Sequence, residues 1–408
     1  MALNRTRTDM MEAIMQESTN KPTEKRMHAL DAFRGITITM MILVNNPGSW
    51  AYMYKPLKHA EWNGWTPTDF IFPFFIFIMG ISIVLALTKK IENKVNKSQL
   101  YREIFIRTLK LFALGVLLNL FTIHLFAPEH HWVEDTLFNV RIMGVLQRLA
   151  VIYAITALLF LNLNHSALIK TGVSLLIFYW LAMFYFPFST SINGVTIDLT
   201  GTLEHGKNFA AYVDSVIIGA KHVYFTQNVL FPYDPEGLFS TIPALATCLS
   251  GVITGLYLQK NQPLLKQILT LFYWGLILLL AGQLMNYSFP INKTIWSPSY
   301  VVFMAGMALL FLSGCIYLID YKKIKRWSYP FNIFGEHAIT FFMFSGILAR
   351  VILIITVGDL RLRDWLYITI YSPLFGQMLG SLVFSLIFLL ISYKVLTWLA
   401  RKNILLRV

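Results

Sequence analysis

The chain has 408 residues, of which 56% are hydrophobic and only 13% are charged. A soluble domain usually carries about 25% charged residues, so this composition excludes an ordinary soluble protein and predicts an all-α, polytopic membrane protein. The formal net charge of +13 comes from basic residues scattered over short segments rather than gathered on one face, which argues against nucleic-acid binding.

About ten stretches are apolar and long enough to be transmembrane helices. A span needs about 20 mostly apolar residues, and its backbone polar groups must be satisfied within a helix. The predicted spans are 35–54, 67–88, 103–125, 142–162, 167–187, 237–258, 264–286, 298–319, 331–356 and 372–398.

The distribution of lysine and arginine predicts the orientation of these spans. Basic residues are more abundant in the loops that alternate spans place on the side of the N-terminus, which marks that side as cytoplasmic. We therefore expect a cytoplasmic segment 1–30 without a cleavable signal peptide, and a transmembrane domain 31–400. We also expect an extracytoplasmic loop 188–236 and a cytoplasmic tail 401–408.

The first span contains the sequence Asn-Asn-Pro-Gly at 45–48. Proline lacks a backbone donor and glycine loosens a helix, so we expect an unwound or kinked section here. Such a break is tolerated at membrane depth where it lines a cavity. The alternative is a packing kink whose asparagines bond to a neighbouring helix.

A polar loop at 58–69 joins the first two spans and holds His59. An imidazole titrates near neutral pH and can transfer a proton or carry an acyl group, although a loop histidine can also be merely solvated. Asp69 follows in the same loop, where it could cap the second helix. The predicted orientation places this loop on the extracytoplasmic side.

Further polar residues converge on the same half of the bundle. Asp234, Glu236 and Lys293 precede spans six and eight, while Gln147 and Arg148 lie inside span four. Arg148 is about two turns from the outer end of its span, so it should face the bundle interior.

A second polar group lies at the cytoplasmic end. Asp31 and Arg34 are three residues apart and can pair on one helix face. The basic run 322–326 comes before span nine, near whose start lies His337. This run is either an orientation signal or a phosphate site for an anionic cytosolic cofactor, supported by helix N-termini.

Other chemical signatures are absent from the sequence. No cysteine or histidine pair has a convincing metal-ligand spacing, because His130 and His131 are adjacent. There is no nucleotide-binding glycine fingerprint and no Gly-x-Ser-x-Gly nucleophile motif. We therefore expect no metal.

Several motifs between about residues 28 and 340 together resemble one family, the heparan-alpha-glucosaminide N-acetyltransferases. They are Leu-Asp-Ala-Phe-Arg-Gly-Ile at 30–36, Lys-His-Ala-Glu-Trp-Asn-Gly at 58–64, Phe-Pro-Phe-Phe-Ile-Phe-Ile-Met-Gly at 72–80, Arg-Ile-Met-Gly-Val-Leu-Gln-Arg-Leu at 141–149, Asp-Pro-Glu-Gly at 234–237 and Asn-Lys-Thr-Ile-Trp-Ser-Pro-Ser-Tyr at 292–300.

The resemblance implies transfer of an acetyl group from cytosolic acetyl-CoA to the amine of a glucosamine-type sugar on the far side of the membrane. It places the active-site histidine at His59 and its associated asparagine at Asn45. The large luminal domain of the lysosomal enzyme has no counterpart in this sequence. We therefore expect an enzyme of the bacterial inner membrane that acts on another amino sugar or glycan, with a homodimer expected by analogy.

Acyl transfer from a thioester requires a base, an oxyanion stabiliser and positioning. His59 could deprotonate the amine or accept the acetyl group first. Asn45 or Lys293 could stabilise the oxyanion, and Asp69 or Glu61 could orient the imidazole. The predicted contacts of the CoA thioester are Arg34, Gln147, Arg148, Lys293 and His337.

Two other function classes fit parts of the sequence. A transporter or flippase for a sugar or an anionic metabolite would also have about ten spans, a broken first helix and a buried arginine. In that case His59→Ala should leave CoA consumption unaltered. A non-enzymatic membrane partner is the third class, but it would not need dense polar groups on the outer half.

Overall fold

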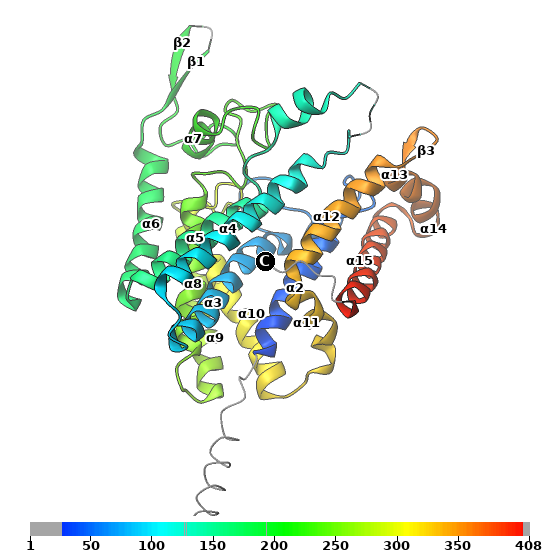
Figure 1. Cartoon of the computed structure of the whole chain (residues 1–408). Helices are drawn as coiled ribbons and strands as arrows, with labels where there is room; N and C mark the ends of the chain where they lie inside the picture. The colour runs from blue at the N-terminus through cyan, green and yellow to red at the C-terminus, as the bar shows by residue number, and fades with distance from the viewer. Residues whose placement is uncertain (1–26, 126, 128, 193, 403–408) are drawn as a thin grey trace, which may run out of the picture.

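The computed structural model describes residues 27–125, 127, 129–192 and 194–402 (Figure 1). Most of the predicted cytoplasmic segment 1–30 and of the tail 401–408 therefore lies outside the described residues. The described chain is mostly helical, which confirms the all-α class. Its strands form two small antiparallel hairpins.

Long helices make up the body of the molecule. They are α2 (His28–Asn45), α3 (Ile71–Glu92), α4 (Lys97–Leu120), α5 (Val145–Asn162), α6 (His165–Tyr185), α8 (Thr241–Leu258), α9 (Leu264–Met285), α10 (Pro298–Cys315), α12 (Ala338–Ile354) and α15 (Gln377–Arg401). The shorter elements are α7 (Phe209–Ile217), α11 (Tyr329–Glu336), α13 (Leu362–Leu366), α14 (Ser372–Phe375), β1 (Ser189–Ile192), β2 (Val195–Asp198), β3 (Thr356–Val357) and β4 (Leu360–Arg361).

Seven helical segments of the described chain are long and apolar enough to cross a membrane, and residues 326–354, which include α11 and α12, are apolar enough together but bent by 76° at a break. Helices α2 and α4 occupy the places of the first and third predicted spans. They are less apolar, because Asp31 and Arg34 lie in α2 and several charged residues lie in α4. The predicted ninth span, 331–356, is therefore a broken helix rather than a continuous one.

The predicted bounds of the first span, 35–54, are wrong, because α2 ends at Asn45. Pro47 cannot donate the next helical hydrogen bond, so the chain unwinds as the Asn-Asn-Pro-Gly motif predicted. The amide of Asn46 donates back to the Ile42 carbonyl at 2.8 Å. Ser385 of α15 donates to the Asn46 carbonyl at 3.0 Å, which satisfies the backbone where the helix stops.

The packed centre of the bundle contains α3, α8 and α10. Helices α3 and α8 approach closely because each has a glycine at the crossing: a Cβ at Gly80 would overlap the Cys248 carbonyl, and one at Gly251 would overlap that of Phe77. The outer helices α6 and α9 instead expose large apolar side chains such as Ile177 and Leu280. This arrangement suits a bundle whose rim faces lipid.

Loop structure gathers at one end of the bundle, at the top of Figure 1. The hairpin β1–β2, in which Ser189 faces Asp198, lies there, together with the short helix α7. The hairpin β3–β4 and α13 lie at the same end, and α11 lies at the opposite end. Helices α12 to α15 stand on one side of α2, while α4, α5 and α6 stand on the other (Figure 1).

Candidate active site

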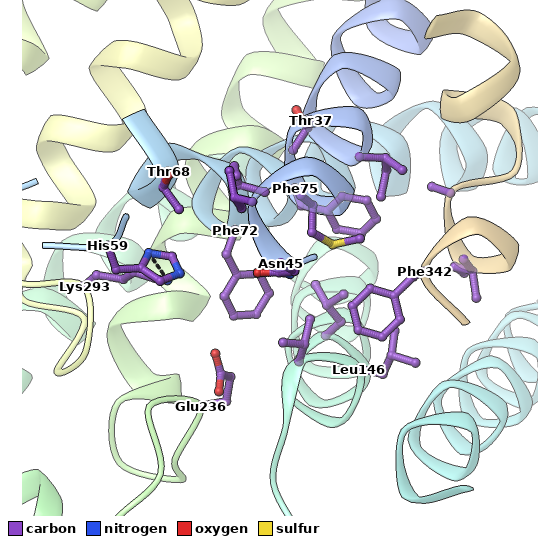
Figure 2. Close-up of a pocket in the computed structure, with 18 residues that line it drawn as sticks. Thr37, Asn45, His59, Thr68, Phe72, Phe75, Leu146, Glu236, Lys293 and Phe342 are labelled. Atoms are coloured by element: carbon purple, nitrogen blue, oxygen red, sulfur yellow. Dashed lines mark hydrogen bonds between the residues drawn. The ribbon is translucent and has the colours of Figure 1, made fainter. Parts of the chain in front are cut away.

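A cavity of about 150 Å³ lies between α2, α3, α5 and α12 (Figure 2). Its apolar wall consists mainly of Ile38, Met41, Val44, Ile71, Phe72, Phe75, Val145, Leu146, Leu149, Ala338, Ile339 and Phe342. Its polar residues are Thr37, Asn45, His59, Thr68, Glu236 and Lys293. In Figure 2, His59 and Lys293 lie together at the left, with Glu236 below them and Thr37 at the top. The cavity therefore suits a ligand with an apolar arm and a polar reactive end.

His59 is held by the buried carboxylate of Asp69. The Nδ1 atom of His59 lies 2.6 Å from Oδ1 of Asp69, and the Asp69 side chain is 1% exposed whereas that of His59 is 47% exposed. A carboxylate accepts this bond only if Nδ1 carries the proton. Nε2 is then the atom that can accept a proton or an acyl group.

Asp69 also fixes the loop that carries His59. Its Oδ2 atom accepts the backbone N–H of Thr66 at 2.9 Å and that of Ala60 at 3.1 Å. Thr66 and Asp69 form a capping box at the start of the short helix that leads into α3. Asp69 therefore takes part in the cap as its N3 residue, with Thr66 as the N-cap, and the same carboxyl group contacts the imidazole.

Lys293 reaches the ring from a different loop. Its Nζ atom lies 3.0 Å from Nδ1 and 3.2 Å from Nε2 of His59, and 3.8 Å from the Asp69 carboxylate. Burial lowers the pKa of Lys293, although Asp69 and Glu236 oppose this effect. A lysine that gives up its proton more readily can exchange it with the adjacent imidazole.

Glu236 adds a negative charge to the cavity wall. Its carboxylate pairs with Arg141 at 2.5 Å. Burial alone would raise the pKa of Glu236, but the charges of Arg141, Arg148 and Lys293 outweigh burial and lower it. Glu236 is therefore ionised at neutral pH and faces the same space as His59.

The loops that carry His59 and Lys293 are joined to each other. The backbone N–H of Gly64 donates to the Ile291 carbonyl at 2.7 Å, and Asn292 donates to the Asn63 side chain at 3.2 Å. Gly64 has φ +97°, a conformation that favours glycine. These contacts fix the position of the His59 loop relative to the Lys293 loop.

The structure thus brings together several of the predicted site residues. His59, Asn45 and Lys293 line one cavity, with Asp69 directly behind the imidazole. Asn45 is exposed at the end of α2, and its side chain forms no hydrogen bond with another described residue. Gln147 lines a second, adjacent cavity.

The other predicted residues do not line the cavity of His59. Arg34 donates to the Ser82 hydroxyl at 2.7 Å and to the Gly335 carbonyl at 3.3 Å, so it joins α2 to α3 and α11. Arg148 is fully buried over the Trp296 ring. His337 occupies the break between α11 and α12, next to lining residues of α12. Their predicted contacts with CoA stay predictions.

Sequence reasoning gave no role to Glu236, although it noted the residue among the polar groups of the outer half. The sequence feature that could have pointed to Glu236 is the Asp-Pro-Glu-Gly turn before α8. What placed Glu236 in the cavity is its pairing with Arg141, 95 residues away in the chain.

The sequence also matches known proteins. Residues 26–202 match the family described as heparan-alpha-glucosaminide N-acetyltransferase, catalytic. The mouse heparan-alpha-glucosaminide N-acetyltransferase is 31% identical over 372 residues, which is 82% of this chain and 55% of the mouse protein. The human protein of the same name is 31% identical over 375 residues, with the same shares covered. The chain thus spans about half the length of these curated relatives.

Proposed function

Because the chain belongs to the heparan-alpha-glucosaminide N-acetyltransferase family, we propose that it is a transmembrane acetyltransferase that uses acetyl-CoA to acetylate the amine of a glucosamine-type sugar. The observation that carries this proposal is the His59–Asp69 hydrogen bond of 2.6 Å, placed where a largely apolar cavity becomes polar. This arrangement offers a channel for a flexible thioester arm and a base at its end.

The acetyl donor enters from the cytoplasmic end. The wall formed by α2, α3 and α12 is apolar, which suits the pantetheine arm, while the acetyl carbonyl approaches His59. The Asn45 amide and the Lys293 ammonium are the donors that would stabilise the negative charge on the carbonyl oxygen. Arg34, His337 and the basic run 322–326 would bind the CoA phosphates on the cytoplasmic side.

The transfer itself requires one proton acceptor. In the direct route, the sugar nitrogen attacks the thioester carbon, a C–N bond forms, and the C–S bond breaks. Nε2 of His59 takes the amine proton and returns it to the CoA thiolate. In the alternative route, Nε2 attacks first and CoA leaves as a thiolate; the amine then attacks the acetyl carbon, a C–N bond forms as the Nε2–acetyl bond breaks, and the amine proton passes through Nε2 to the thiolate. Asp69 holds the ring in either route.

The proposed topology has ten spans and cytoplasmic termini, with the His59 loop on the extracytoplasmic side of a bacterial inner membrane. It counts α2, α4 and the bent pair α11–α12 as spans. The bias of basic residues supports it, as does the gathering of the hairpins and α7 at the end opposite α11 (Figure 1). The expected partners are membrane lipids and, by family analogy, a second copy of the chain.

The test supplies acetyl-labelled acetyl-CoA to the purified protein in detergent with a panel of amino sugars. We expect label in the acetamide of at least one sugar, with equal release of CoA, and no label with the corresponding sugar that lacks the amine. Absence of label from every amino sugar would contradict the proposal.

A transporter is the second candidate, favoured by the bend of 76° between α11 and α12 and by the unwound end of α2. It predicts sugar uptake into proteoliposomes without CoA and without release of free thiol. Uptake that persists in His59→Ala, together with no acetylated sugar, would favour transport over catalysis.

A further inference from the structure

A second cavity, of about 230 Å³, lies beside the one that holds His59, between α2, α4, α5 and α12. The two cavities share the lining residues Met41, Asn45, Val145, Leu146 and Phe342. They therefore meet at the end of α2, where Asn45 faces both. A ligand in the second cavity would lie next to the proposed reaction centre.

The second cavity is more polar than the first. Its polar lining consists of Asn45, Asn46, Asn119, Arg141, Gln147, Ser345 and Arg350. Gln147 is 1% exposed, and its Nε2 atom has no hydrogen-bond partner among the described residues. A buried donor without a partner is costly, so it indicates a place where a ligand or water accepts a bond.

Arg350 is the second donor of this cavity. Its only hydrogen bond with the described residues goes to the Gly346 carbonyl, at 3.0 Å. Among the described residues, the charged group that acts electrostatically on Arg350 is another cation, Arg141. By contrast, Arg141 itself is neutralised by Asp234 and Glu236. A buried or membrane-embedded cation is usually paired with an anion, and Arg350 has no such partner among the described residues.

The position of this cavity suits the acceptor rather than the donor. Gly115 and Asn119 lie near the end of α4, and Arg350 lies near the end of α12. These ends adjoin the loops at the top of Figure 1, the side that the proposed topology makes extracytoplasmic. The apolar first cavity is the better fit for the thioester arm.

We propose that the second cavity binds an anionic group carried by the acceptor, a phosphate, sulfate or carboxylate, with Arg350 and Gln147 as its donors. This inference rests on the proposed acetyltransferase function and specifies its substrate: an amino sugar that bears a negative charge, either on the sugar itself or through a lipid carrier.

The experiment measures binding of labelled glucosamine and labelled glucosamine 6-phosphate to the purified full-length protein, without acetyl-CoA. We expect the phosphorylated sugar to bind at least about tenfold more tightly, since a charge-assisted bond is stronger than a neutral one. Arg350→Gln should remove this preference, and Arg350→Lys should retain part of it. The matched control is Arg363→Gln at the same end, because Arg363 pairs with Asp364 at 2.7 Å and does not line the cavity.

Competition separates the two sources of the anion. If phosphatidic acid in nanodiscs displaces the sugar phosphate and phosphatidylcholine does not, the anion is carried by a lipid. This displacement should require Arg350. Displacement by inorganic phosphate alone would identify a soluble one. Equal binding of neutral and phosphorylated sugar, unaffected by Arg350→Gln, would overturn the inference.

Two measurements keep this inference distinct from the proposed function. Acetyl transfer without any preference for an anionic acceptor would overturn the anion site and leave the acetyltransferase intact. Arg350-dependent anion binding without acetyl transfer to any amino sugar would overturn the enzyme and leave the binding site. His59→Ala should abolish transfer while retaining the Arg350-dependent binding.

Discussion

Two carboxylates near the candidate site have similar burial but different partners. Asp69 is 1% exposed and Asp234 is 1% exposed. Asp69 binds His59, whose side chain is 47% exposed, whereas Asp234 binds the guanidinium of Arg141 through two bonds of 2.7 Å.

The difference separates a reactive pair from a structural one. His59 keeps Nε2 free to accept and return a proton while Nδ1 bonds Asp69, whereas Arg141 stays charged because Asp234 and Glu236 raise its pKa against the effect of burial. A buried aspartate therefore holds a titratable group in one place and a permanent charge in the other. We therefore expect substitutions in the His59–Asp69 pair to lower activity and substitutions in the Arg141–Asp234 pair to lower stability.

The largest expected effect is that of His59→Ala on the first pair. Loss of the base should lower kcat for acetyl transfer by about 10²–10⁴-fold while leaving the melting temperature nearly unchanged, since the ring is half exposed. The assay is CoA release with saturating acceptor. His222→Ala serves as the control, because His222 lies on the same half but bonds the Val140 carbonyl.

Arg141→Met tests the second pair. It would leave Asp234 and Glu236 without their partner, which should cost about 3–5 kcal/mol of stability. Thermal unfolding in detergent measures this loss. A variant with wild-type stability would mean that the ion pairs of Arg141 with Asp234 and Glu236 do not stabilise the fold.

Asp69→Asn tests whether the Asp69 carboxylate acts on catalysis through His59. The amide group can turn its NH₂ toward Nδ1 and so stabilise the wrong tautomer of the ring, and kcat should fall by up to about 10⁴-fold with a smaller change in the KM for acetyl-CoA. A changed pH profile would show that Asp69 acts through His59. An unchanged profile with lower stability would show that its role is confined to the helix cap.

Asp214 gives the smallest expected effect, on the pH dependence of stability. Burial raises its pKa to about 7, although backbone N–H groups of Asp234, Phe239 and Leu238 oppose the shift. The folded state therefore holds a proton that the unfolded state has lost, and stability should fall as pH rises from about 4 to about 7. Asp214→Asn should flatten this slope in melting curves. A slope identical to the wild type would contradict the assignment.

Local patterns were sufficient to predict much of this molecule. Apolar runs predicted the helices, and Pro47 predicted the unwound end of α2. The spacing of His59 and Asp69 in one loop made their contact predictable. The start of α2 was missed because its first turns, with Asp31 and Arg34, look polar in sequence although they are packed against α11.

Long-range contacts decided what the sequence left open. Arg148 was expected to face the bundle interior and is indeed buried, but no local pattern indicates that its neighbour is the Trp296 ring. Glu236 enters the cavity because Arg141 pairs with it across the fold. The lack of an anionic partner for Arg350 becomes visible only when α2, α4, α5 and α12 are assembled.

The most direct test of acetyl transfer across the membrane uses proteoliposomes with acetyl-CoA on one side and an amino sugar on the other. We expect acetylated sugar on the side of the His59 loop and free CoA on the opposite side, with both lost in His59→Ala. Acetylated sugar formed at an undiminished rate by His59→Ala would contradict it.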